Sequence, residues 1–244
     1  MKSMERDQMS NVIKEFSRFA HHYDAHNMIQ AQVAKRLVSK LPSSSYVNIL
    51  DLGCGSGEVF KNLQTSPLAF KTFTALDSSQ SMLDLHPQSD VVTKVCANFN
   101  EKGFISTLPK DQYDLLISAS AIQWSEDLDF TLKALSSICD RAYMAIFTSG
   151  TFATLHKVGN VTSPIYAAKV LEEKIEKYYM NVDFELHTYT LHFDSVRDMF
   201  RYIKKSGVSA GEKKLGFKET KSLMENYPLD YLEFEVLFVE AKNV

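Results

Sequence analysis

The segment from residue 49 to residue 57, Ile-Leu-Asp-Leu-Gly-Cys-Gly-Ser-Gly, strongly limits how this chain can fold. The apolar run that leads into it starts at Tyr46 and is typical of a strand buried on both faces. Gly53, Gly55 and Gly57 follow at alternate positions, and glycine permits positive φ angles and close approach of a ligand to the backbone. A helical pattern resumes after them. The segment therefore predicts a strand, a tight glycine turn and a helix, with a ligand site at the turn.

A second apolar run, from Phe73 to Leu76, ends on Asp77, twenty residues after Gly57. An acidic side chain at this spacing, at the end of the next strand, is typical of sites that bind the two hydroxyls of a ribose. We therefore expect Asp77 to lie beside the glycine turn and to bind a ribose.

Apolar runs and helical patterns alternate between residues 46 and 148, which predicts a doubly wound, mostly parallel α/β sheet. Strands are expected at 46–51, 71–76, 91–96, 113–119 and 142–148, with a helix at 127–138. Two helices over residues 9–40 precede them. After residue 148 we expect a helix near 166–180, a strand at 184–193, a helix at 195–205 and a final strand at 232–241.

The composition excludes several classes of protein. A net charge of −3 argues against general nucleic-acid binding, because no overall positive field would attract a polyanion. Cys54, Cys96 and Cys139 are widely spaced and odd in number, so neither a disulfide framework nor a zinc site is expected. The start of the chain resembles no signal peptide, and no apolar run is long enough to span a membrane. We therefore expect a cytoplasmic protein without membrane contact.

A cluster near the start, His21, His22, Asp24 and His26, resembles a metal site in composition only. His22 and His26 straddle an expected helix break, so they do not form a zinc-binding pair on one helix face. We expect no metal.

Two ligands fit a glycine turn followed by an acidic strand end, a dinucleotide and S-adenosylmethionine. Dinucleotide sites use the spacing GxGxxG, whereas this turn reads GxGxG, and Glu58 would face a diphosphate unfavourably. Asp51 and the GxGxG spacing resemble motif I of the class I S-adenosylmethionine-dependent methyltransferases. The resemblance implies a seven-stranded Rossmann-like methyltransferase fold with S-adenosylmethionine as cofactor and S-adenosylhomocysteine as product.

The same resemblance indicates which residues contact the cofactor. Asn98 follows the third strand, where this class reads the adenine amino group, and Met82 is expected to pack on the adenine. The full set of expected cofactor contacts is Tyr23, Asp51, Gly53, Cys54, Gly55, Gly57, Asp77, Ser78, Met82, Asn98, Phe99 and Ser118.

Within that class, flanking segments resemble the malonyl-acyl-carrier-protein O-methyltransferases of biotin synthesis. The first segment is 16–26 with 30–32, where Tyr23 has the position that closes over the cofactor. The others are 118–124, which ends in Gln123-Trp124, 147–155, and the tail at 191–193, 201–207 and 228–231. The likeness is weak over residues 156–190, which would cover the acceptor. A small-molecule carboxyl O-methyltransferase and a non-catalytic cofactor-binding subunit therefore stay open as alternatives.

The family resemblance implies methyl transfer to the free carboxylate of a malonyl thioester. A carboxylate is ionised near neutral pH, so no general base is needed. The donor and the acceptor are expected to be positioned by Tyr23, Gln123 and Trp124. Candidates for holding the acceptor carboxylate are Arg18, Arg201 and Lys204.

We expect one methyltransferase domain over residues 1–244, with an N-terminal helical cap at 1–42 and a helical lid inserted at 149–181, and a monomer. Residues 196–221 carry eight basic and three acidic side chains. This asymmetry is suited to attracting an acidic partner such as an acyl carrier protein, although a solvated helix face would look the same.

Overall fold

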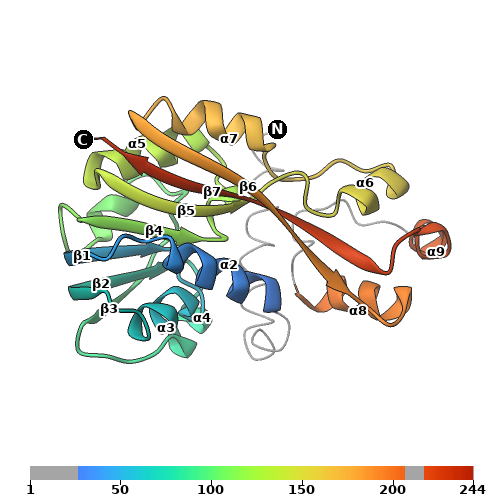
Figure 1. The fold of residues 1–244 in the computed structure, drawn as a ribbon, viewed down its shortest axis with the longest axis horizontal. Coiled ribbons are helices and arrows are strands. Elements are labelled where there is room, and N and C mark those ends of the chain that lie inside the picture. Colours follow the sequence, from blue (N-terminus) through green and yellow to red (C-terminus); the bar gives the residue numbers. More distant parts are fainter. Residues whose placement is uncertain (1–26, 207–216, 244) are drawn as a thin grey trace.

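The computed structural model describes residues 27–206 and 217–243, and in helices α8 and α9 the side chains of 204–206 and 217 are not described. A seven-stranded sheet in the order β3-β2-β1-β4-β5-β7-β6 forms its centre (Figure 1). The strands are β1 (Ser45–Leu52), β2 (Ala69–Asp77), β3 (Val92–Cys96), β4 (Leu115–Ala119), β5 (Arg141–Phe147), β6 (Asn181–His192) and β7 (Tyr231–Lys242). The first five are parallel, and β7 runs antiparallel to both of its neighbours. The predicted doubly wound, mostly parallel sheet is confirmed.

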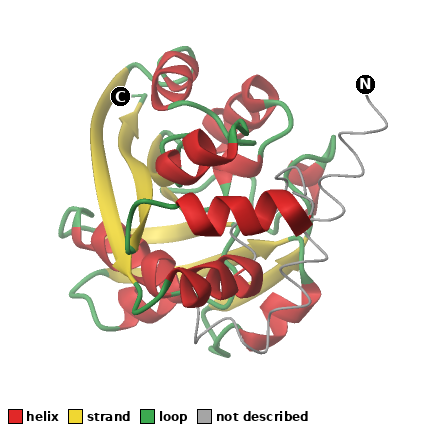
Figure 2. Cartoon of the chain, turned by 90° about the vertical axis from the view of Figure 1, so that its right-hand side faces the viewer, coloured by secondary structure: helices red, strands yellow, loops and turns green. Residues whose placement is uncertain are grey.

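Helices lie on both sides of the strands (Figure 2). They are α2 (Met28–Ser39), α3 (Glu58–Gln64), α4 (Gln80–Leu85), α5 (Leu128–Ile138), α6 (Ala153–Gly159), α7 (Ala168–Ile175), α8 (Val196–Ser206) and α9 (Phe217–Asn226), with short 3₁₀ turns at Phe104–Thr107 and Ile122–Trp124. No helix in the described ranges is long and apolar enough to cross a membrane.

The apolar runs of the central strands fill two cores because successive side chains of a strand point to opposite faces. In β4, Leu115 and Ile117 join the core under α2 and α3, whereas Leu116 joins the core under α5 and α7. All three are fully buried. The continuous hydrophobic character of the strands, rather than an alternating one, follows from burial on both faces.

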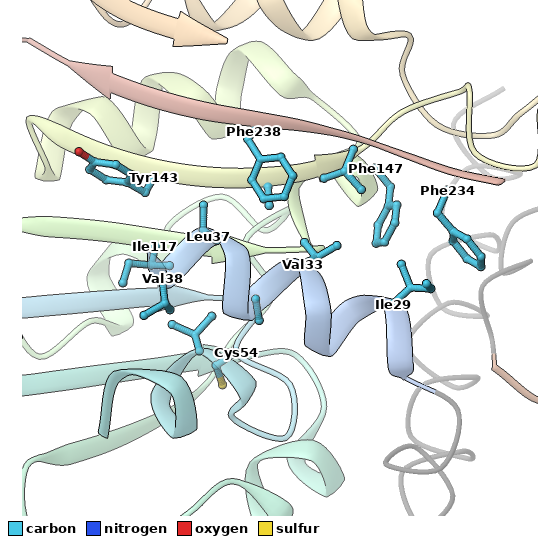
Figure 3. Close-up of a cluster of buried hydrophobic side chains, with 14 of the residues drawn as sticks. Ile29, Val33, Leu37, Val38, Cys54, Ile117, Tyr143, Phe147, Phe234 and Phe238 are labelled. Carbon is cyan, nitrogen blue, oxygen red and sulfur yellow. The ribbon is translucent and has the colours of Figure 1, made fainter. Parts of the chain in front are cut away.

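Helix α2 is the part of the predicted N-terminal cap that the structure describes. Ile29, Val33 and Leu37 recur every four residues, so they share one face of the helix and point towards the sheet (Figure 3). They pack in one core with Phe147 and Phe238. The other predicted helix, at the start of the 9–40 segment, falls in residues 1–26, which lie outside the described residues together with the histidine cluster.

The predicted lid segment, 149–181, is arranged differently from the expectation. Helix α7 is shorter than predicted, and its Leu171 and Ile175 are fully buried in one core with Leu135 and Ile138 of α5. Apolar contacts of this kind hold α7 in the helix layer on one face of the sheet. The helix expected to cap the carboxyl edge of the sheet is therefore not placed there.

The helices that do lie beyond this edge are α6, α8 and α9, at the right of Figure 1. Strand β7 pairs with β5 only from Val236 onwards, whereas its first residues extend past the end of β5 and pair with β6 alone. Three side chains are buried on this extension, namely Phe152 directly before α6, Met199 of α8 and Leu223 of α9. Helix α8 corresponds to the helix expected at 195–205, whereas neither α6 nor α9 was expected from the sequence.

We expect the packing of α2 to be a major source of stability. Replacing Leu37, which is fully buried, by alanine should lower the free energy of unfolding by about 2–5 kcal/mol, measured by urea denaturation. The control is Met28→Ala on the same helix, because Met28 is 47% exposed and its loss should change stability by less than about 0.5 kcal/mol. Equal effects of the two substitutions would contradict this role of α2.

Candidate functional site

The glycine turn after β1 is fastened to the end of the neighbouring strand β2. The amides of Gly53 and Cys54 both donate to the carbonyl oxygen of Leu76, at 2.8 and 2.9 Å. Gly53 has a φ of 71°, and a Cβ on it would lie 2.2 Å from the Cβ of Ala121. Only glycine fits this position, because both the backbone conformation and the close contact with Ala121 exclude a side chain.

Gly55 is required for a different reason. Its φ is 51°, and a Cβ added to it would meet no protein atom within 4 Å. The missing side chain therefore leaves open space above the backbone, where a ligand can approach closely.

Asp77, at the end of β2, ties the glycine turn to the next helix. One carboxylate oxygen accepts from the amide of Gly55 at 2.9 Å, and the other accepts from the amide of Ser79 at 2.8 Å. Burial raises the pKa of Asp77, while backbone N–H donors, those of Ser79 and Gly55 first, lower it in part. Asp77 therefore lies beside the glycine turn, as the sequence predicted.

These elements enclose a pocket at the carboxyl edge of the sheet, lined by residues from α2, the turn, the ends of β2, β3 and β4, and Trp124. Nine predicted site residues line it, namely Gly53, Cys54, Gly55, Asp77, Ser78, Met82, Asn98, Phe99 and Trp124. Nine residues that the sequence analysis did not select also line it, namely Gln30, Ala34, Ser56, Glu58, Val59, Ser79, Ala119, Ser120 and Ala121. Ser56 and Ser79 could have been inferred from their place in the turn and at the start of α4, whereas no local pattern identified Gln30.

Three predicted residues lie behind the pocket wall. The Ser118 hydroxyl donates to the carbonyl oxygen of Leu52 at 2.8 Å and links β4 to β1 inside the sheet. The Gln123 side-chain amide donates to the carbonyl oxygen of Ser120 at 2.7 Å, so it supports the wall instead of lining it. The space beside Gly57 is filled by His86 and Pro87, at 2.8 and 2.7 Å from a Cβ position. Each of these residues shapes the site without facing the pocket.

The candidate acceptor-binding residues are not gathered at the pocket among the described residues. Arg201, on α8, is exposed and forms an ion pair with Asp198. Lys204 lies on the same helix, and its side chain is outside the described part. Arg18 and Tyr23 precede residue 27 and also lie outside it. In the described ranges, no group of three or more His, Cys, Asp or Glu residues is arranged to hold a metal ion.

Asp51 carries a buried carboxylate directly beneath the turn. It is fully buried, and neither oxygen has a hydrogen-bond partner among the described residues. Burial raises its pKa well above the usual range, and the charge of Asp77 raises it further. Asp51 therefore destabilises the protein when it is ionised, unless a ligand supplies positive charge or hydrogen-bond donors.

Three polar atoms of the pocket lining also lack a hydrogen-bond partner among the described residues. Gln30 Oε1, Ser56 Oγ and Ser120 Oγ are buried and make no hydrogen bond to the described residues. Buried polar atoms are normally paired, so a concentration of unpaired ones indicates a site that a polar ligand completes. The open space above Gly55 and these atoms fit a ligand with an apolar ring system and several polar groups.

Comparison with known proteins shows which class of enzyme the chain resembles in sequence and fold. Residues 50–141 match the sequence model of the methyltransferase domain family. The chain also has the fold of solved methyltransferase structures, including the plantazolicin methyltransferase BpumL in complex with S-adenosylhomocysteine (TM-score 0.55, 14% identity, 100% of this chain and 97% of that one). A second solved structure with this fold is the YcgJ protein of Bacillus subtilis, with a TM-score of 0.62 and 11% identity. The match covers 87% of this chain and 99% of YcgJ. The chain is an S-adenosylmethionine-dependent methyltransferase with the class I fold.

Curated relatives of known name show which methyltransferases the chain resembles. The chain is 29% identical over 217 residues to the malonyl-[acyl-carrier protein] O-methyltransferase of Bacillus cytotoxicus. The alignment covers 80% of this chain and 75% of the relative. The enzyme of the same name from Haemophilus influenzae is 28% identical over 235 residues, covering 91% and 85%. Within its class, the chain thus resembles the malonyl-[acyl-carrier protein] O-methyltransferases along most of its length.

The buried charge of Asp51 predicts a stability gain on its removal. Because the pKa of Asp51 is raised in the folded state, its contribution to stability falls as the pH rises from the unfolded-state pKa to the folded-state pKa. Ligand-free Asp51→Asn should therefore melt above the wild type at pH 8, by on the order of 2–4 °C. The difference should shrink as the pH falls through the folded-state pKa, and vanish near pH ~4.

Thermal unfolding monitored by circular dichroism across this pH range tests the expectation. Asp90→Asn is the control, because Asp90 is exposed and its charge has little effect on folding. A variant of Asp51 that melts below the wild type at pH 8 would contradict the assignment of a destabilising buried charge.

Proposed function

We propose that this protein transfers the methyl group of S-adenosylmethionine to the free carboxylate of a malonyl thioester carried by an acyl carrier protein, in the formation of a biotin precursor. The observation that carries the proposal is the similarity to malonyl-[acyl-carrier protein] O-methyltransferases, which extends over 80% of the chain or more in relatives from different bacteria. The donor is supported independently by the pocket beside the glycine turn.

The residues that line the pocket suit the donor. The Asp77 carboxylate would accept hydrogen bonds from the two ribose hydroxyls, and Asn98 would contact the adenine edge. Met82, buried at the start of α4, would pack against the adenine face. The missing Cβ of Gly55 leaves room for the rest of the molecule, and Asp51 lies where a positive charge would stabilise it. When bound, S-adenosylmethionine supplies an electrophilic methyl group.

The protein's contribution to the reaction is positioning, because the acceptor carboxylate is already ionised at neutral pH. Oxygen, methyl carbon and sulfur must lie in line at near-attack distance, with water excluded. Trp124 lines the pocket and would exclude water, while Gln123 holds the backbone at Ser120. Tyr23 would close the donor end. A cation is still needed for the acceptor, and Arg18, Arg201 and Lys204 are the candidates.

The extension that carries α6, α8 and α9 would receive the carrier protein. Helices α8 and α9 pack against each other beyond the carboxyl edge of the sheet (Figure 1). Arg197, Lys218 and Lys221 are exposed on them, within the segment of excess positive charge. Acyl carrier proteins are acidic, so this surface would increase their rate of association.

The proposal is tested by supplying methyl-labelled S-adenosylmethionine together with a malonyl carrier protein, malonyl-CoA or free dicarboxylic acids. We expect the highest kcat/KM with the malonyl carrier protein. Faster transfer to a free dicarboxylic acid would identify a small-molecule carboxyl methyltransferase. Donor binding without transfer to any acceptor would support a non-catalytic subunit.

We expect Asp77→Ala to weaken the binding of S-adenosylhomocysteine by about 100-fold or more, measured by calorimetry. The ribose would lose two hydrogen bonds to a charged carboxylate, and the amides of Gly55 and Ser79 would lose the acceptor that holds their loops. Asp84→Ala is the control, since Asp84 is exposed on the adjacent helix α4 and does not line the pocket. An unchanged affinity of the Asp77 variant would refute the assignment of the donor site.

Reversing charges on the α8–α9 surface should affect only the carrier-bound substrate. In the Arg197→Glu, Lys218→Glu double variant we expect KM for the malonyl carrier protein to rise about 10-fold, most strongly at low salt, with KM for malonyl-CoA unchanged. The matched control is the Lys35→Glu, Lys71→Glu double variant, which reverses two exposed charges on α2 and β2 and should leave both KM values unchanged. Equal effects on the two substrates would exclude docking at this surface.

A further inference from the structure

Ser120, directly after β4, has an unusual backbone conformation. Its φ of 66° lies in the left-handed region that glycine adopts readily and other residues avoid. Two hydrogen bonds hold it there. Its amide donates to the carbonyl oxygen of Ala145 at 2.8 Å, and its carbonyl oxygen accepts from the Gln123 side chain at 2.7 Å. The buried Gln123 therefore fixes the direction in which the Ser120 side chain points.

The Ser120 side chain is unfavourable in a second way. Its hydroxyl oxygen is buried, has no hydrogen-bond partner among the described residues, and belongs to a residue that lines the pocket. Glycine at this position would avoid both the strained backbone and the unpaired hydroxyl. Backbone strain and unpaired buried polar groups at one residue are typical of positions that are maintained for function.

The sheet order places Ser120 away from the nucleoside half of the donor site. Asp77 follows β2 and Asn98 follows β3, on one side of β1, whereas Ser120 follows β4 on the other side. Its neighbours in the wall, Ala119 and Ala121, have no polar side-chain groups. A ligand group that extends past the donor towards β4 thus meets a stretch of wall from Ala119 to Ala121 whose one polar side-chain group is the buried, unpaired hydroxyl of Ser120.

We propose that the Ser120 hydroxyl donates a hydrogen bond to the acceptor carboxylate, on the oxygen that is not methylated. This inference rests on the proposed methyl transfer to a carboxylate, and it assigns a positioning residue for the acceptor. A neutral donor of this kind orients the carboxylate while leaving the charge on the attacking oxygen largely available. Gln123 acts through Ser120, by holding the hydroxyl in the direction of the acceptor.

The test compares Ser120→Ala and Ser120→Gly with the wild type. We expect KM for the malonyl acceptor to rise about 10-fold in both variants, because a hydrogen bond to a charged group is lost, with kcat changed less than about 3-fold. The affinity for S-adenosylhomocysteine, measured by calorimetry, should stay the same. Ser120→Gly should melt at a higher temperature than Ser120→Ala, since only glycine relieves the strained backbone.

Ser125→Ala is the matched control, at a buried serine that does not line the pocket. Its hydroxyl is bonded to the hydroxyl of Thr131 at 2.8 Å, so its loss should lower the melting temperature and leave acceptor KM unchanged. Recovery of wild-type KM in Ser120→Gly alone would show that strain, not the hydroxyl, is responsible, and would overturn the inference. Unchanged acceptor KM in both variants would overturn it as well.

Failure of this inference is distinguishable from failure of the proposed function. If the wild type methylates no carboxylate, the proposed function fails, and the Ser120 assignment to the acceptor fails with it. If the wild type methylates the malonyl acceptor but Ser120→Ala loses S-adenosylhomocysteine affinity instead of acceptor affinity, the proposed function stands. Ser120 would then belong to the donor site, and only the inference is overturned.

Discussion

The attachment of the glycine turn to the end of β2 is the interaction on which the rest of the site depends. Two amides of the turn share the carbonyl oxygen of Leu76, and the next residue along β2, Asp77, receives the amide of Gly55. These bonds cross between the ends of two parallel strands, so protein hydrogen bonds alone hold the turn in place. The same carboxylate also receives the amide of Ser79 at the start of α4. The Asp77 side chain thus orders two of the loops that line the pocket.

This arrangement concentrates negative charge in a buried place. Asp51 lies beneath the turn and Asp77 beside it, and the charge of Asp77 contributes to the raised pKa of Asp51. Backbone N–H donors stabilise Asp77, whereas Asp51 has no partner among the described residues. The ligand-free site is therefore less stable than a site filled by a cationic ligand, and the sulfonium donor of a methyltransferase has the matching charge.

The proposed acceptor side is built on different structural elements from the donor side. The donor pocket uses local features, the turn and the ends of β2 and β3, whereas α6, α8 and α9 stand on an extension of β6 and β7 beyond the parallel strands. The weak similarity over residues 156–190 to the family falls partly on this extension. With the proposed acceptor site on this extension, methyltransferases that share a donor site can differ in their acceptor, because separate parts of the fold carry the two sites.

The sequence alone determined the central sheet, the glycine turn and the place of Asp77, because burial on both faces and the need for positive φ leave direct marks on local residue choice. It did not determine which side chains near the end of β4 face the pocket. Ser118 was expected at the site and Ser120 was not, yet Ser120, in a left-handed backbone conformation, lines the pocket, while the Ser118 hydroxyl is bonded inside the sheet. Likewise, α7 had the pattern of a cap but packs on α5, and α6 contacts α9 across more than fifty residues of chain. Such contacts join distant segments, so only the tertiary structure decides them.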